Sequence, residues 1–148
     1  MTTEQEIRII ALDIGDERVG VAVSDPLGFF GEPLAVLPRG NNIMSELLKI
    51  VEKYKNQVIV VGFPRNLKGE TGPQAQKVLN FVDELKKTFA NIDIILWDER
   101  YTSVIAHQIF RNINIRGRKE RRIKDSMEAV VILESYLGYL RRAKRSED

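Results

Sequence analysis

The stretch IRIIALDIGDERVGVAVS, residues 7–24, decides how this chain folds. Its first eight residues are largely apolar and β-branched, which predicts a strand over 7–14. The next four, Gly15-Asp16-Glu17-Arg18, have the composition of a tight turn. Residues 19–24 alternate valine with small residues, which predicts a second strand. Two strands joined by so short a turn form an antiparallel hairpin.

The pattern downstream of this hairpin predicts one more edge strand and then an alternation of helices and strands. Pro33 and Pro38 bracket the edge strand, as prolines do at the margin of a sheet. The expected further strands are 31–37, 58–61 and 92–97, and the expected helices are 43–54, 75–89, a short one after Thr102, and one from about 125. Right-handed crossovers would place the last two strands parallel to the first.

We therefore predict a single α/β domain over residues 1–148. Its five-stranded mixed sheet begins with an antiparallel meander of three strands and continues with parallel strands. Helices flank the sheet on both faces. A chain of 148 residues with 43% hydrophobic residues is long enough to bury a substantial core without disulfides.

Composition excludes several classes of protein. The chain has no cysteine and one histidine, which excludes disulfides, thiol nucleophiles, Cys-ligated zinc and a histidine-rich metal site. No apolar run is long enough to span a membrane, and the polar first six residues do not resemble a targeting signal. We expect a cytoplasmic protein in which any metal has oxygen ligands, as Mg²⁺ or Mn²⁺ prefers.

Charge is distributed unevenly along the chain. Residues 1–110 carry 12 basic and 15 acidic residues, whereas residues 111–148 carry 11 basic and 6 acidic ones. The two basic clusters are Arg116, Arg118, Lys119, Arg121, Arg122 and Lys124, then Arg141, Arg142, Lys144 and Arg145. This asymmetry indicates a polyanionic partner. A solvated loop over about 112–122 and a cationic helix end, favoured by the helix dipole, are the alternatives.

Acidic residues stand at the carboxyl ends of two predicted strands. Asp13 ends the first strand, and Asp98 and Glu99 end the last. The carboxyl ends of parallel strands meet at one edge of a sheet, so these residues should converge, with Asp125 closing the group from the final helix. Converging carboxylates repel one another unless a divalent cation binds them, and such a site suits phosphodiester hydrolysis.

Each acidic residue also has a purely structural interpretation. Asp13 could form a turn, Asp98 and Glu99 could be loop charges, and Asp125 could cap a helix. Because side chains alternate along a strand, only one of Asp98 and Glu99 can face the group.

The segment from Val61 to Gly69 is predicted to be the end of a strand and the loop that follows it. Its glycines permit close backbone approach, and Arg65 and Lys68 could meet phosphate. The spacing of a Walker A motif is absent. An ordinary strand-to-helix connection is the alternative.

Four blocks of the chain resemble the YqgF (RuvX) family. In chain order they are Asp13-Ile14-Gly15 with RVGVAVSD (18–25), VGFP (61–64) through Gly69, WDERYTS (97–103) and DSMEAVVIL (125–133). The resemblance implies an RNase H-like fold and a metal-dependent nuclease. By matched position, the catalytic and metal-binding acidic triad of that family falls on Asp13, Glu99 and Asp125.

The resemblance also bears on the surrounding residues. Asp98 would then only support the triad. Glu128 stands where the family usually has alanine, so it either adds a carboxylate or pairs with the basic loop. The residues expected to contact nucleic acid are Arg18, Arg65, Lys68, Arg100, Thr102, Arg116, Arg118, Lys119, Arg121 and Arg122.

The favoured function is metal-dependent cleavage of precursor 16S rRNA at its 5′ end during ribosome biogenesis. Two alternatives stay open: a Holliday junction resolvase acting on four-way DNA, and a nucleic-acid-binding module without catalysis. A kinase-like ATPase needs a second domain of this kind, for which the chain has no room. No exposed apolar stripe predicts a tight dimer, so we expect a monomer or a weak dimer.

Overall fold

The computed structural model describes residues 8–64, 72–99 and 117–147, with the side chains of 117–125 and 146–147 outside that description. The strands are β1 (Ile9–Ile14), β2 (Arg18–Ser24), β3 (Gly31–Pro38), β4 (Val58–Phe63) and β5 (Asp93–Asp98). The helices are α1 (Ile43–Tyr54), α2 (Pro73–Thr88) and α4 (Gly117–Glu147). Within the described residues, no helix is both long and apolar enough to cross a membrane.

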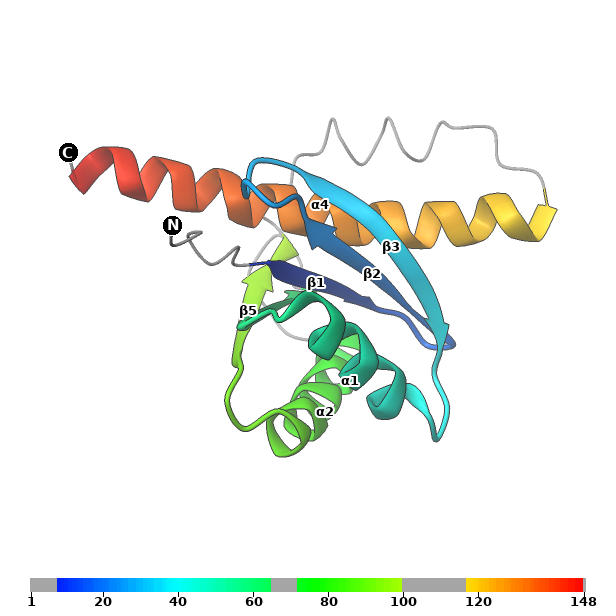
Figure 1. Cartoon of the computed structure of the whole chain (residues 1–148). Coiled ribbons are helices and arrows are strands. Elements are labelled where there is room, and N and C mark those ends of the chain that lie inside the picture. Colours follow the sequence, from blue (N-terminus) through cyan, green and yellow to red (C-terminus); the bar gives the residue numbers. More distant parts are fainter. Residues whose placement is uncertain (1–7, 65–71, 100–116, 148) are drawn as a thin grey trace.

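The five strands form one mixed sheet in the order β3-β2-β1-β4-β5 (Figure 1). β1 pairs antiparallel with β2, which pairs antiparallel with β3, whereas β1, β4 and β5 run parallel. Asp13 of β1 pairs with Gly20 of β2, and Leu12 pairs with Val61 of β4. The predicted meander followed by parallel strands is confirmed.

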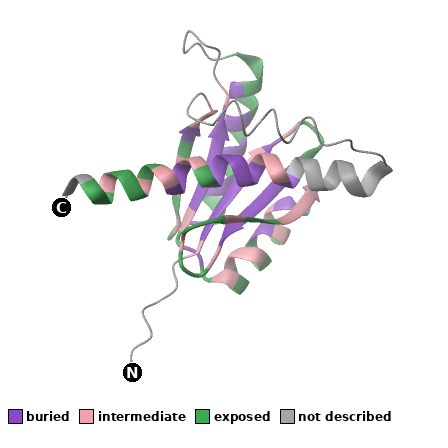
Figure 2. Cartoon of the chain, turned by 90° about the horizontal axis from the view of Figure 1, so that it is seen from above, coloured by how far each residue is buried: buried purple, intermediate pink, exposed green. Residues whose placement is uncertain are grey.

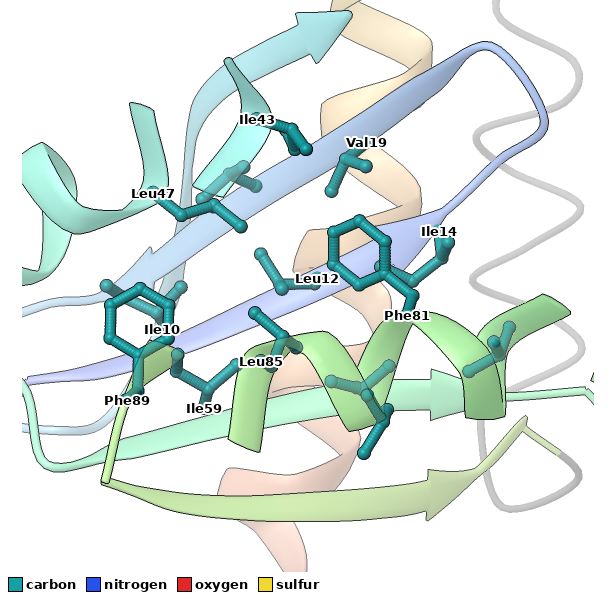
Figure 3. Close-up of a cluster of buried hydrophobic side chains, with 14 of the residues drawn as sticks. Ile10, Leu12, Ile14, Val19, Ile43, Leu47, Ile59, Phe81, Leu85 and Phe89 are labelled. Atoms are coloured by element: carbon teal, nitrogen blue, oxygen red, sulfur yellow. The ribbon is translucent and has the colours of Figure 1, made fainter. Parts of the chain in front are cut away.

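Helices α1 and α2 cover one face of the sheet. Alternate residues of β1 and β4 point toward them and form a core with Leu47 of α1 and Phe81 and Leu85 of α2 (Figure 3). The strand residues of this core include Ile10, Leu12, Ile14, Ile59, Val61 and Phe63. Burial of this apolar surface supplies the main favourable free energy of folding.

Helix α4 lies across the other face (Figure 2). Its residues Ala129, Ile132, Leu133 and Tyr136 pack on the remaining alternate residues of the strands, among them Ala11, Ala22, Val60 and Trp97. The small alanines of β1 and β2 let the helix approach closely. The Trp97 indole N–H donates to the Ser135 hydroxyl at 3.0 Å, which satisfies the polar atom of a buried ring.

The predicted start of the last helix, α4, is wrong. α4 begins at Gly117 and not near Asp125, so residues 117–122, predicted as a loop, are helical and Asp125 does not cap the helix. The segment GRKERRIK is rich in Arg, Lys and Glu, which have high helix propensity, and its lack of apolar periodicity hid that propensity. The short helix predicted after Thr102 lies outside the described residues.

Adjacent leucines of α1 offer a direct test of the core. Leu47 is 1% exposed and Leu48 is 41% exposed. We expect Leu47→Ala to lower the free energy of unfolding by about 2–5 kcal/mol, because it leaves a cavity. Leu48→Ala should lower it by no more than about 1 kcal/mol. Urea unfolding followed by Trp97 fluorescence measures both, and equal losses would contradict this assignment of the core.

Candidate functional site

The turn between β1 and β2 places Asp13 at the carboxyl end of β1. Within the turn, the Gly15 amide donates to the Arg18 carbonyl at 2.8 Å. A Cβ on Gly15 would lie 2.8 Å from that carbonyl oxygen, so no larger residue fits without a shift of the backbone. The turn borders a pocket of about 240 Å³, lined by Asp13, Gly15, Asp16, Glu17, Arg18 and Gly20.

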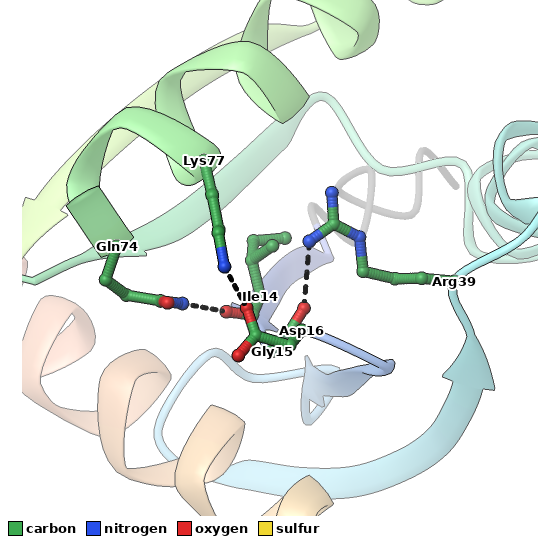
Figure 4. Close-up of polar contacts among 6 residues, drawn as sticks. All are labelled: Ile14, Gly15, Asp16, Arg39, Gln74 and Lys77. Atoms are coloured by element: carbon green, nitrogen blue, oxygen red, sulfur yellow. Dashed lines mark hydrogen bonds and ion pairs between the residues drawn. The ribbon is translucent and has the colours of Figure 1, made fainter.

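Side chains from α2 hold this turn in place (Figure 4). The Gln74 amide donates to the Ile14 carbonyl at 3.3 Å, and the Lys77 ammonium lies 2.9 Å from the Asp16 carboxylate. Lys77 holds the pKa of Asp16 below its ordinary value through a hydrogen bond and Coulomb attraction. Asp16, in the turn, is therefore paired with α2, the helix on the face of the sheet opposite α4.

Arg39, directly after β3, forms hydrogen bonds with the other side of the β1–β2 turn. Its guanidinium donates to the Gly15 carbonyl at 3.0 Å, and its amide donates to the Glu17 carbonyl at 2.8 Å. The sequence alone does not mark Arg39, Gln74 or Lys77 as positioning residues. No spacing in the chain signals these contacts, because each joins segments that only the folded sheet brings together.

Glu99, directly after β5, lies on the α4 face of the sheet. A Cβ on Gly62 of β4 would lie 2.7 Å from the Glu99 Oε1 and 2.5 Å from the Ile132 Cδ1. Glu99 and α4 thus both use the space that the missing side chain of Gly62 leaves. Asp13 belongs to the same face, since it alternates with Ile9 and Ala11, which pack on α4.

Asp98 belongs to the opposite face. It pairs with Phe63, which lies in the core under α1 and α2. Side chains alternate along β5, so only one of Asp98 and Glu99 can lie on the face of Asp13. In the structure that residue is Glu99. This is the arrangement that matching the family pattern implied.

Glu128 of α4 approaches Glu99. Burial raises the pKa of Glu99, and the charges of Glu128 and then Asp98 raise it further. Glu128 lies one helical turn before Ile132, the residue that contacts Gly62, so the helix directs it toward the same edge of the sheet. The structure therefore gathers Asp13, Glu99 and Glu128 on one face.

Asp125 lies three residues before Glu128 on α4, one turn further toward the helix N-terminus. Its side chain falls outside the described part of the chain. So do Arg65, Lys68, Arg100, Thr102 and Arg116, and the side chains of Arg118, Lys119, Arg121 and Arg122 in the first turns of α4. Arg18 is described, and it lines the pocket beside Asp13.

Carboxylates that share one face of a sheet are a donor set suited to an oxygen-preferring divalent cation. Among the described side chains, no three His, Cys, Asp or Glu residues are grouped closely enough to hold a metal. Asp13 and Glu99 are of the donor chemistry that such an ion prefers.

Comparison with known proteins places this chain among nucleases. The family model described as "RuvX: Holliday junction resolvase" matches residues 7–139. A Clostridium botulinum protein named "Putative pre-16S rRNA nuclease" is 40% identical over 136 residues, which cover 90% of this chain and 98% of the relative. A protein of the same name from Clostridium tetani is 41% identical over 133 residues, covering 88% and 96%.

Solved structures share the fold. RuvC of T. thermophilus in complex with a Holliday junction superposes with a TM-score of 0.60 at 15% identity, covering 92% of this chain and 96% of RuvC. The fowlpox virus Holliday junction resolvase gives a TM-score of 0.53 at 14% identity, covering 90% and 99%. Both are RNase H-like, as predicted for this chain.

Gly62→Ala tests the shared space between Glu99 and α4. The new methyl group would overlap Ile132 and the Glu99 carboxylate. We expect it to displace one or both side chains and to cost about 1–3 kcal/mol of stability, as overpacking does. Urea unfolding measures this, with Gly40→Ala as the matched control because a Cβ at Gly40 meets nothing within 4 Å. Equal stability of the two variants would contradict the close approach.

Glu99→Gln tests the burial of the carboxylate. In the folded protein the pKa of Glu99 is raised above its ordinary value of 4.5, so the folded state binds this proton more tightly than the unfolded chain does. The free energy of unfolding therefore falls as the pH rises from 4.5 through the raised pKa. We expect Glu99→Gln to be more stable than the wild type at pH 7 in EDTA, and this advantage should vanish near pH 4. Thermal unfolding of both proteins across this pH range measures the difference, and a glutamine variant less stable at pH 7 would refute it.

Proposed function

Because this chain belongs to the RuvX family, we propose that it is an endonuclease that matures the 5′ end of precursor 16S rRNA by hydrolysing a phosphodiester bond. The relatives named "Putative pre-16S rRNA nuclease" match this chain over 98% and 96% of their length. The proposal rests on Asp13 and Glu99, at the carboxyl ends of β1 and β5. It also includes a cytoplasmic location for the protein.

The single observation that carries the proposal is the position of Glu99 on the face of Asp13. Its carboxylate lies over Gly62 of β4, the strand next to β1, which carries Asp13. Partial burial, and then the charges of Glu128 and Asp98, raise the pKa of Glu99, which a purely structural role would not require. Functional groups gather at the carboxyl ends of parallel strands in sheets of this kind.

In the proposed mechanism, Asp13, Glu99 and Asp125 would hold Mg²⁺ or Mn²⁺, and the carboxylate of Glu128 would add negative charge beside Glu99. A divalent ion at such a site lowers the pKa of water and stabilises negative charge on phosphate oxygens. The bonds of Arg39, Gln74 and Lys77 keep the β1–β2 turn rigid, so Asp13 keeps its orientation as substrate binds.

The surroundings of Asp13 admit a phosphate. Gly20, which pairs with Asp13 across the sheet, has no side chain, and the pocket opens there. Arg18 on the pocket rim is suited to bind a phosphate next to the one that is cleaved. Arg65, Lys68, Arg100, Thr102 and the cluster Arg116, Arg118, Lys119, Arg121 and Arg122 are proposed to bind the flanking nucleotides.

Resolution of Holliday junctions is the second candidate, favoured by the description of the family model. The two proposals share the site and differ in the substrate. A resolvase cuts two strands symmetrically and so needs two sites related by a two-fold axis. The assay below therefore offers both substrates to the same protein.

Asp13→Asn should abolish cleavage while leaving the fold intact. We expect a loss of at least 100-fold, because even the outer partners of metal ligands are worth about 10–100-fold. The assay supplies precursor 16S rRNA and a four-way DNA junction in Mg²⁺, Mn²⁺ or EDTA. Asp93→Asn, an exposed aspartate at the opposite end of β5, is the matched control and should retain activity.

The outcomes separate the proposals. Metal-dependent cutting of RNA that Asp13→Asn loses supports rRNA maturation, whereas paired symmetric nicks in the junction support a resolvase. Full activity in Asp13→Asn would refute the assignment of the site. Binding of RNA with no cutting of either substrate would favour the non-catalytic module.

A further inference from the structure

The loop between β2 and β3 exposes three large apolar side chains. Leu27 is 78% exposed, Phe29 is 50% exposed and Phe30 is 65% exposed. The loop lies at the opposite end of the sheet from Asp13, because it begins after Ser24, whose hydroxyl accepts the amide of Ile9 at the start of β1. The proposed catalytic site therefore does not account for these rings.

The loop that carries the exposed rings is a turn closed by hydrogen bonds to Asp25. The Asp25 carboxylate accepts the amides of Phe29 at 2.7 Å, Phe30 at 2.6 Å and Leu27 at 3.3 Å. The Gly28 amide returns to the Asp25 carbonyl at 2.9 Å, and the Asp25 amide donates to the Phe30 carbonyl at 2.9 Å. These bonds lower the pKa of Asp25, and they fix the backbone that presents the two phenyl rings to solvent.

A basic helix end adjoins the same loop. The Arg141 guanidinium of α4 donates to the Phe29 carbonyl at 2.8 Å. Arg142, Lys144 and Arg145 follow on the exposed last turns of α4. The carboxylates of Asp25 and Glu134 accept backbone amides of the loop and keep their negative charge, and the four basic residues in the last turns of α4 outnumber these two acids.

We propose that Phe29, Phe30 and the basic end of α4, here called the aromatic platform, bind the unpaired bases and phosphates of single-stranded RNA. Exposed aromatic rings stack on bases of any sequence, while neighbouring cations bind the backbone. A second copy of this chain is the less favourable occupant, because a two-fold contact would bring two basic helix ends together.

The aromatic platform would extend the proposed function, on which this inference rests. Thirteen residues of α4 separate Glu128 at the catalytic edge from Arg141 at the platform, a distance of about 20 Å along the helix. One RNA could therefore occupy both places at once. The platform would hold an unpaired flank of the precursor while the carboxylates act on the bond to be cut.

The test is the affinity of the full-length protein for a fluorescent single-stranded RNA of about 16 nucleotides, measured by anisotropy in EDTA. The variant F29L/F30L keeps apolar side chains and removes the planar rings. We expect it to bind about tenfold more weakly, the effect of losing one stacked base. The control Leu48→Ala removes an exposed apolar side chain from α1 and should bind like the wild type.

A blunt RNA duplex is the matched probe, because its base faces are hidden. Its affinity should change little in F29L/F30L. The variant R142Q/R145Q should instead lower the salt dependence of single-strand binding by about 0.7 per charge removed.

Unchanged single-strand affinity in F29L/F30L would overturn the platform and leave the catalytic proposal standing. A platform that mediates self-association would appear in sedimentation equilibrium as a dimer that F29A/F30A dissociates without loss of RNA affinity, and this too would overturn the proposal. A wild type that binds no RNA would overturn the platform and also count against the proposed function, whose own test is the Asp13→Asn assay.

Discussion

The close approach of α4 to Gly62 is the contact on which the catalytic edge of this protein depends. Ile132 occupies the space that a side chain at residue 62 would fill, and Glu99 lies against the same backbone position. Because a helix repeats every 3.6 residues, seating Ile132 there also sets the direction of Glu128 one turn earlier. A glycine near the carboxyl end of a buried strand thus determines where a carboxylate on a distant helix lies.

The second constraint is the rigidity of the β1–β2 turn. A hairpin turn that carried Asp13 on flexible backbone would lose orientation whenever a charged substrate approached. Here the carbonyls of Ile14 and Gly15 each accept a side chain from a different layer, Gln74 from α2 and Arg39 from the end of β3. Helix α2, on the face opposite α4, therefore helps to position a residue of the α4 face.

Helix α4 connects the two functional regions proposed for this protein. Its middle packs across β1, β2 and β4, so its position is set by the apolar core. Its two ends carry basic residues, one near the catalytic edge and one beside the β2–β3 loop. A long substrate that follows the helix would meet cations at both ends and carboxylates between them, an arrangement that suits a structured RNA with single-stranded flanks.

Local pattern was enough to predict the sheet and most of its helices. The apolar strands, the tight turn and the helical periodicity of α1 and α2 are properties of neighbouring residues, and the structure confirms them with small shifts of their ends. The same kind of pattern misplaced the start of α4, because charged helix formers without an apolar stripe resemble a loop. Alternation along β5 showed that Asp98 and Glu99 face opposite ways.

Which of the two acids faces Asp13 was decided by the tertiary structure. The answer depends on the layer that each face of the sheet packs against, and the layer on the face of Glu99 is α4, whose Ile132 lies 33 positions along the chain. The contacts of Arg39, Gln74 and Lys77 with the turn arise in the same way. The chain by itself determined which chemistry was present, carboxylates at strand ends and no thiols, because that follows from residue type. Only folding decided which carboxylates meet, because that depends on distances between segments that the sequence does not encode locally.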